Sequence, residues 1–173
     1  MTQETTQQIA IRLIGNAHAP QAAELILSIQ QGEFNIPVTL EGQPDLQDIE
    51  RFFYGGSGGF WGAFEGDRLV GTIGLLPIRD HGGVIRKMFV HKDYRGRPWN
   101  IAQQLLETLL AHCRAAGIED LYLGTVEKLQ AAARFYERNG FVKISKASLP
   151  PSFPLLSVDN TFYHLHIGKN GSE

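Results

Sequence analysis

A cluster of basic residues stands directly before a segment in which leucines recur at helical spacing, and such an arrangement can bind phosphate groups. The twelve residues 86–97 carry five basic side chains and a single acid, Asp93. The basic residues are Arg86, Lys87, Lys92, Arg95 and Arg97. The first turn of a helix has unpaired N–H groups and the positive end of the helix dipole, which attract anions. Residues 85–117 therefore predict a strand, a loop and a helix that hold a phosphate-bearing ligand, with a solvated basic surface as the competing interpretation.

A second candidate for chemistry is Tyr136, in the segment FYERNGF at residues 135–141. A phenol with a pKa of about 10 can donate a proton to a leaving group that lies within hydrogen-bond reach. Phe135 and Tyr136 could instead be packing residues on one face of a helix, and for a tyrosine without motif context packing is the commoner role.

Length and composition indicate one globular domain. The chain has 173 residues, of which 43% are hydrophobic and 20% charged, and these values are ordinary for a globular protein with a full core. The longest apolar runs are only a few residues, and MTQETTQQ lacks the regions of a signal peptide. We therefore expect a cytoplasmic protein that makes no contact with a membrane.

Net charge and cysteine content exclude some functions. The net charge is -2, from 16 basic and 18 acidic residues, so no global positive field attracts nucleic acid. Cys113 is the only cysteine, which rules out an internal disulfide and a cysteine-rich metal site. His164 and His166 share one face of the last expected strand, but no third ligand has suitable spacing, so we expect no metal.

The elements that must position these residues can be outlined from hydrophobic periodicity and turn signals. Asp45 is expected to cap the second helix. The expected helices span residues 20–31, 45–53, 98–116 and 128–138. The expected strands span residues 9–14, 60–64, 69–76, 84–90, 121–125, 141–147 and 160–167.

This order of elements predicts a mixed sheet with helices packed on it. Consecutive hairpin strands make the first part antiparallel, whereas the strand, helix and strand around residues 98–116 make a parallel pair. The fold class is therefore α/β, or α+β. We expect a single domain over residues 1–173, with short flexible tails at about 1–7 and 169–173.

The segment RPWNIA, residues 97–102, resembles the R/Q-x-x-G-x-G/A signature of the GNAT superfamily of N-acetyltransferases. The strand ending MFV, the turn HKDYRGR, LYLGT and AAARFYERNGF follow the order and approximate spacing of that family over residues 84–142. The resemblance implies a GNAT-like mixed sheet of six to seven strands flanked by about four helices. It also implies that acetyl-coenzyme A is the co-substrate.

The resemblance assigns the coenzyme to specific residues. Backbone N–H groups of 97–102 would hold the pyrophosphate, and main-chain groups of 88–90 would pair with the pantetheine arm as an added strand. Asn100 replaces the first signature glycine, and asparagine tolerates left-handed backbone angles. Pro98 removes one N–H donor. The implied coenzyme-binding residues are Met88, Phe89, Val90, Arg95, Gly96, Arg97, Pro98, Trp99, Asn100, Ile101 and Ala102.

The resemblance makes Tyr136 the acid that protonates the coenzyme thiolate, whereas the general base stays open. Arg86 lies where relatives often place a base, and an arginine cannot accept a proton at neutral pH. We hypothesise that Arg86 binds an acidic group of the substrate, with pairing to an internal acid as the alternative. Phe34 and Ile36 are expected in the wall of the acceptor pocket. The candidate bases are Glu33, Glu41, Asp80, His81 and Glu127.

The leading hypothesis is an N-acetyltransferase that moves acetyl from acetyl-coenzyme A to a primary amine of a small molecule, by direct attack in a ternary complex. A coenzyme-binding regulatory module without turnover is the alternative from another class. GGSGG at residues 55–59 matches the G-x-S-x-G of hydrolases, but a helix precedes it and a strand follows, which is the reverse of the required order. The acceptor, the acyl-chain preference and the choice between monomer and homodimer stay open.

Overall fold

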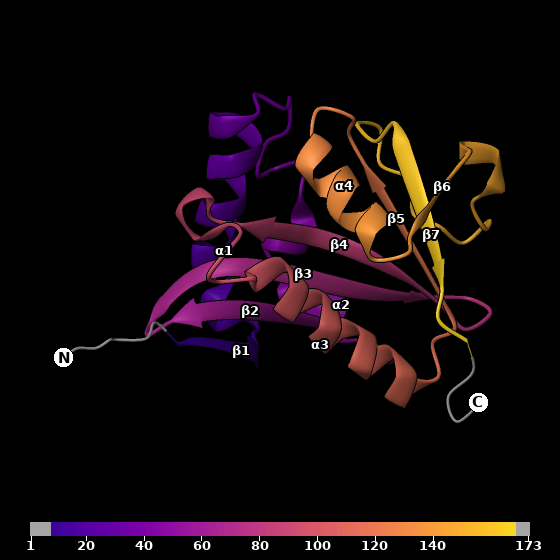
Figure 1. Ribbon diagram of the computed structural model, residues 1–173, viewed down its shortest axis with the longest axis horizontal. Helices are drawn as coiled ribbons and strands as arrows, with labels where there is room; N and C mark the ends of the chain where they lie inside the picture. Colours follow the sequence, from indigo (N-terminus) through magenta and orange to yellow (C-terminus); the bar gives the residue numbers. More distant parts are fainter. Residues whose placement is uncertain (1–7, 169–173) are drawn as a thin grey trace.

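The computed structural model describes residues 8–168, which form a mixed sheet of seven strands with four α-helices packed on it (Figure 1). The strands are β1 (Ile9–Leu13), β2 (Gly59–Glu65), β3 (Arg68–Ile78), β4 (Gly82–Val90), β5 (Asp120–Thr125), β6 (Val142–Ile144) and β7 (Thr161–His166). The helices are α1 (Ala19–Leu27), α2 (Ile49–Phe53), α3 (Ile101–Ala116) and α4 (Gln130–Arg138). The α/β class is confirmed, and the expected tails at 1–7 and 169–173 lie outside the described residues.

The strand order is β1-β2-β3-β4-β5-β7-β6. All neighbouring strands are antiparallel except β4 and β5, which form the parallel pair expected around α3. This pair is short, because β4 and β5 are hydrogen-bonded only from Gly82 to Val84 on β4. Beyond Val84 no neighbouring strand pairs with β4 on that side among the described residues, so the sheet opens in its middle.

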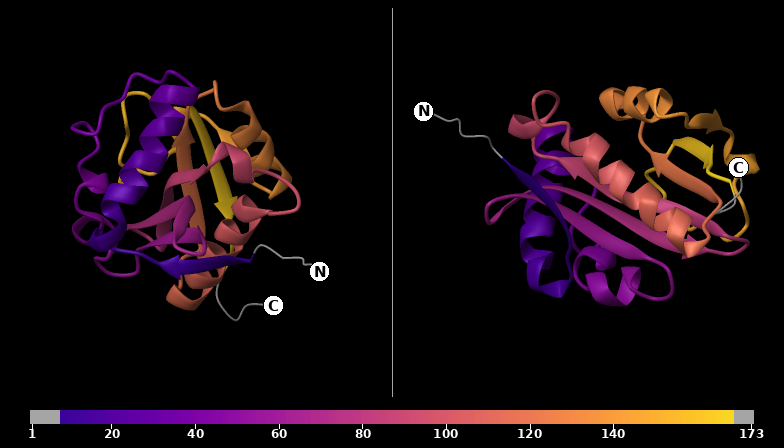
Figure 2. Two further views of the ribbon diagram at one scale, coloured as in Figure 1. Left: turned by 90° about the vertical axis from the view of Figure 1, so that its left-hand side faces the viewer. Right: turned by 60° about the horizontal axis from the view of Figure 1, so that its bottom comes forward.

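Helices cover both faces of the sheet, with α3 and α4 on one side and α1 and α2 on the other (Figure 2). Alternation along β2 supplies both cores, because successive side chains of a strand point to opposite faces. Trp61 and Ala63 belong to the core under α3, whereas Phe60 and Phe64 belong to the core under α1 and α2. Each fully buried aromatic side chain contributes about 1.5–3 kcal/mol through the area it removes from water.

Several expected element boundaries differ from the observed ones: the strand expected at 141–147, for example, is only Val142–Ile144. Three further differences have identifiable reasons. The third α-helix begins at Ile101 rather than at residue 98, because residues 97–99 form a turn. The first helix ends at Leu27 and continues as a single π-type segment, Ser28–Glu33. The cap of α2 is Asp48, whose side chain accepts a hydrogen bond from the Arg51 N–H, and not Asp45, which lies buried one turn earlier.

No helix among residues 8–168 combines the length and the apolar character that crossing a membrane requires.

Candidate active site

The loop before α3 is shaped by two residues with left-handed backbone angles. Asn100 has φ 51° and ψ 40°, and Gly96 has φ 72°. The Asn100 N–H donates to the Gly96 carbonyl at 2.9 Å, which closes the turn ahead of the helix. Asparagine is one of the few residues with a side chain that adopts this region readily. Asn100 therefore supplies the conformation that a glycine would otherwise provide.

This turn aims the first backbone amides of α3 at a cavity. Among the described residues, the N–H groups of Ile101, Ala102 and Gln103 have no backbone partner, and no side chain caps the helix. They border a cavity of about 490 Å³, together with the side chains of Arg97 and Arg138. We call residues 95–103 the phosphate cradle. Free amides, a helix N-terminus and two guanidinium groups suit a phosphate-bearing ligand.

Four of the expected coenzyme-binding residues do not border this cavity: Met88, Phe89, Pro98 and Trp99. Met88 and Phe89 line the second cavity described below. The ring of Trp99 packs against Tyr94 with centroids 4.8 Å apart, and Trp99 lies on the core under α3. Pro98 is in the turn but is not part of the cavity wall. Both residues belong to the turn that precedes α3. Arg95 borders the cavity and forms a bidentate ion pair with Glu33, at 2.6 and 2.7 Å.

A β-bulge changes the directions of the β4 side chains, just beyond the part of β4 that pairs with β5. Thr72 of β3 pairs with Phe89 and Gly74 pairs with Arg86, so Lys87 and Met88 oppose a single residue. Lys87 has φ 58°, and its carbonyl accepts a hydrogen bond of 2.7 Å from Thr72 Oγ1. In a regular strand, Arg86 and Lys87 would point to opposite faces. The bulge instead lets both side chains reach the same cavity.

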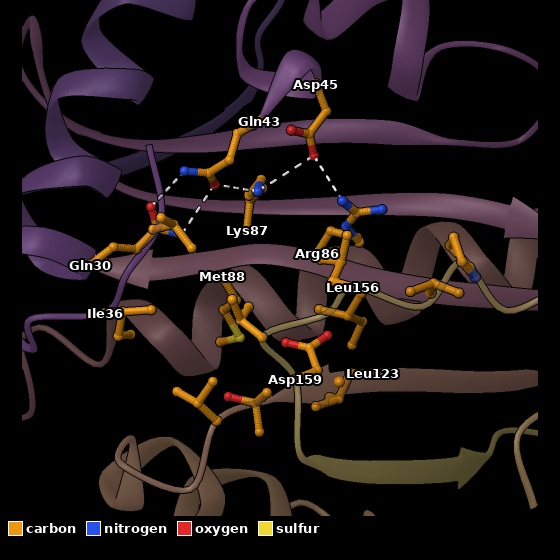
Figure 3. A pocket seen from close by; sticks show the side chains of 18 of the residues that line it. Gln30, Ile36, Gln43, Asp45, Arg86, Lys87, Met88, Leu123, Leu156 and Asp159 are labelled. Carbon is orange, nitrogen blue, oxygen red and sulfur yellow. Dashed lines mark hydrogen bonds and ion pairs between the residues drawn. The ribbon is translucent and has the colours of Figure 1, made fainter. Parts of the chain in front are cut away.

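This second cavity, which we call the central cavity, has a volume of about 470 Å³ and lies between β4, β5, α4 and two loops (Figure 3). Its apolar wall includes Ile36, Leu123, Phe153 and Leu156. Ile36, which the sequence predicts in the wall of the acceptor pocket, thus lines this cavity. Phe34 does not line the cavity, since its ring packs on the core under α1 and its carbonyl accepts a hydrogen bond from Lys128 Nζ.

Four charged residues line the central cavity: Asp45, Arg86, Lys87 and Asp159. Asp45 Oδ2 lies 3.2 Å from Arg86 Nη2 and 3.6 Å from Lys87 Nζ. Lys87 Nζ also donates to Gln43 Oε1 at 2.5 Å, and Figure 3 shows Gln30, Gln43, Lys87 and Asp45 joined in one chain of contacts. Burial lowers the pKa of Lys87, while Asp45 opposes that shift. The internal acid named as the alternative partner of Arg86 is thus Asp45.

Tyr136 reaches the opening of the sheet from α4. Its side chain is buried, lines the central cavity, and donates a hydrogen bond to the sulfur of Met88 at 3.6 Å. Burial raises the pKa of the Tyr136 phenol well above its ordinary value, so the hydroxyl group stays protonated at neutral pH. Tyr136 is therefore both a core residue and a proton-bearing group at the cavity.

The candidate bases named from sequence do not meet at this cavity. The Arg95 hydrogen bond lowers the pKa of Glu33 and occupies its carboxylate. Glu41, Asp80, His81 and Glu127 do not line the cavity. Asp159 does, and burial raises its pKa to about 6 although Arg86 and Lys87 oppose the shift. No sequence signal marked Asp159, because it stands in a connection without regular structure.

The two histidines of the last strand have a structural partner. His164 Nε2 and His166 Nδ1 each lie 2.8 Å from Asp120 Oδ1, and His164 stacks on Tyr122 with ring centroids 4.7 Å apart. Within residues 8–168 no group of three or more His, Cys, Asp or Glu side chains is arranged to hold a metal ion.

The fold and the cradle agree with one family. Residues 23–141 match the model of the Acetyltransferase (GNAT) family, which is more than half of the chain. The chain belongs to the GNAT acetyltransferase family.

Individual relatives support this membership. The chain is 35% identical over 111 residues to the probable N-acetyltransferase family 8 member 5 of Mus musculus, covering 61% of this chain and 48% of that protein. The chain thus spans about half the length of the curated relatives it matches. It is 39% identical to an acetyltransferase of GNAT family from Staphylococcus aureus, with a TM-score of 0.88 over 92% of this chain and 99% of that one.

A more distant structure shares the fold alone. The PaiA N-acetyltransferase from Thermoplasma acidophilum, solved in complex with coenzyme A, is 16% identical with a TM-score of 0.70, over 92% of this chain and 99% of that one.

Proposed function

We propose that this protein transfers an acetyl group from acetyl-coenzyme A to a primary amine of a small molecule, by direct attack in a ternary complex. The observation that carries the proposal is the contact between Tyr136 and Met88 at the opening between β4 and β5. It places a protonated phenol beside the unpaired edge of β4, and the phosphate cradle follows a few residues later at the start of α3.

The coenzyme fits the two cavities in a defined order. Its pyrophosphate binds the free amides of the phosphate cradle, with Arg97 as a side-chain partner. The pantetheine arm pairs with main-chain groups of residues 88–90, because no strand occupies that edge of β4 among the described residues. The thioester then lies near Met88, between the cradle and the central cavity. The coenzyme A bound to the Thermoplasma relative supports this ligand class.

The reaction forms one C–N bond and breaks one C–S bond. The neutral amine attacks the thioester carbon, and a backbone N–H of β4 stabilises the oxygen that becomes negative. The thiolate then leaves and receives a proton. Since the pKa of the Tyr136 phenol is raised, its main contribution is a hydrogen bond donated to the departing thiolate. Counted from its ammonium form, the acceptor loses two protons, one to water before the attack and one as the C–N bond forms, while the thiolate takes up one proton.

The acceptor carries an acidic group in this proposal. Arg86 uses Nη2 for Asp45, and its other guanidinium N–H groups make no hydrogen bond among the described residues. They can bind a substrate carboxylate, while the apolar wall around Leu123 and Leu156 contacts the rest of the molecule. An amino acid with an apolar side chain has these features. Arg86→Lys should raise the KM of such an acceptor, and an unchanged KM would contradict this assignment.

The test is amine-dependent release of coenzyme A thiol from acetyl-coenzyme A. The panel comprises L-leucine and L-phenylalanine, their methyl esters, tyramine and spermidine. We expect release with the amino acids and weaker release with the esters, which lack the carboxylate. Tight coenzyme binding without amine-dependent release would instead support a regulatory coenzyme-binding module.

A further inference from the structure

Asp159 brings an unpaired carboxylate into the central cavity. Its backbone N–H donates to the Leu156 carbonyl at 3.1 Å, and the next residue, Asn160, donates its N–H to the Thr125 carbonyl at the end of β5, at 2.9 Å. These bonds fix the connection before β7 against β5. Asp159 lines the cavity, and Figure 3 shows its oxygens directed into it, with no hydrogen bond or ion pair to any of the residues drawn.

The strand β5 is built to leave room for this carboxylate. A Cβ atom on Gly124 would lie 2.5 Å from Asp159 Oδ2, a distance that real Cβ contacts essentially never show. The carboxylate therefore rests on the bare main chain of β5, in the space that any other residue would fill. Gly124 is thus a positioning residue for Asp159.

The groups that surround the Asp159 side chain account for its raised pKa. Arg86 and Lys87 approach from β4, where Asp45 already pairs with both of them. Tyr136 approaches from α4 as a neutral phenol, and Leu123 and Leu156 are apolar. Burial outweighs the attraction of the two cations and raises the pKa of Asp159 to about 6. The carboxylate is then ionised at pH 7 but more basic than an ordinary aspartate, which suits a general base.

We propose that Asp159 is the general base that accepts a proton from the acceptor amine. The proposal rests on the acetyl transfer proposed above. As the amine nitrogen bonds to the thioester carbon, one N–H proton passes to a carboxylate oxygen of Asp159, which becomes a neutral acid. The ammonium form of the acceptor loses its other proton to water before the attack, and the coenzyme thiolate takes up one proton from water as the C–S bond breaks. Asp159 returns its proton to water after the product leaves, so charge and atoms balance.

The pH dependence of kcat/KM for L-leucine tests this role. We expect an ascending limb with an apparent pKa near 6 in the unchanged protein. Asp159→Asn should lower kcat/KM by about 10²-fold or more and abolish that limb, since general bases typically contribute that much. Coenzyme A binding should stay within about threefold, because the carboxylate lies outside the phosphate cradle. Asp67→Asn, which removes the same charge at the exposed β2–β3 turn, should match the unchanged protein.

Two further variants keep the test decisive if Asp159→Asn folds poorly. Gly124→Ala retains Asp159 but displaces its carboxylate, so turnover should fall while an ascending limb remains. Asp159→Glu keeps a base in a changed position and should shift the limb.

Suppose that the parent protein is active and that Asp159→Asn has nearly the same kcat/KM with the same ascending limb. That result would overturn the inference and leave the proposed function standing. An Asp159→Glu variant whose ascending limb has the same apparent pKa as that of the parent would also overturn the inference. If the unchanged protein acetylates no amine of the panel, both proposals fall together.

Discussion

The hydroxyl group of Tyr136 donates to the sulfur of Met88 across 3.6 Å, and this contact joins α4 to the point where β4 leaves β5. The opening exists because the parallel pairing stops at Val84 and a bulge at Lys87 turns the following residues. The reacting thioester is therefore expected where two helices and two strands converge, with the cradle on one side and the central cavity on the other.

Replacing Tyr136 by phenylalanine should lower kcat by about 10²-fold, because the departing thiolate loses its hydrogen-bond donor. Coenzyme A affinity and melting temperature should change little, since the lost hydrogen bond runs to a weak sulfur acceptor. Tyr163→Phe is the matched control. It removes a buried hydroxyl whose partner is Glu137, away from the cavity, and should leave kcat near that of the parent. Equal kcat values for the two variants would remove Tyr136 from the mechanism.

Asn100 should tolerate glycine but not valine. The left-handed angles at this position, φ 51° and ψ 40°, are open to glycine and cost a side-chain-bearing residue about 1–2 kcal/mol, most of all a β-branched one. Asn100→Val should therefore weaken coenzyme A binding by about tenfold in a calorimetric titration, whereas Asn100→Gly should stay close to the parent. If Asn100→Val binds coenzyme A as tightly as the parent protein, the turn at this position does not determine the geometry of the phosphate cradle.

Asp45 and Asp48 should differ sharply in their contribution to stability. Asp45→Ala leaves Arg86 and Lys87 without their shared carboxylate in a buried setting, which should cost about 3–5 kcal/mol in the free energy of unfolding. Asp48→Ala removes the cap of α2 and should cost about 1 kcal/mol. Urea titrations of the two variants measure the difference. A larger loss in the free energy of unfolding for Asp48→Ala than for Asp45→Ala would contradict the roles assigned to the two residues.

The Cys113 thiol should not react in the folded protein. It should also make the free energy of unfolding depend on pH at high pH. Burial raises its pKa from 9.0 to about 12, so the folded state holds its proton where the unfolded state loses it. Its contribution to the free energy of unfolding is complete below pH 9 and is lost as the pH rises toward 12. Cys113→Ala should show a shallower decline over that range. A thiol reagent should react with the parent only after unfolding, and fast reaction with the native protein would contradict the burial.

The sequence predicted the geometry of the phosphate cradle better than that of the central cavity, and the residues explain why. The cradle is local: the strand, Asn100 and the helix follow one another within a few residues, so spacing and backbone tolerance suffice. The central cavity is assembled from segments around residues 36–45, 86–88, 123–136 and 153–159, which are remote in the chain. Asp159 is one acid in an irregular connection, and only the fold brings it into the central cavity beside Gly124.

The sequence predicted Asp45 as the cap of α2 where the structure has Asp48, and this error has a similar cause. Both are acids just before a short apolar segment, and either satisfies the pattern of a helix cap. The choice depends on the bulge at Lys87, which brings two consecutive cations to Asp45 and leaves the cap to Asp48. A bulge of this kind has no reliable mark in a single sequence.

The central claim is tested most directly by the ratio of acetylated amine formed to coenzyme A thiol released, with L-leucine as acceptor, thiol followed by absorbance and product by mass spectrometry. Direct transfer predicts equal amounts of both, and Tyr136→Phe should slow both equally. Release of thiol without acetylated amine, or coenzyme binding with neither product, would contradict the assignment of this cavity to acetyl transfer.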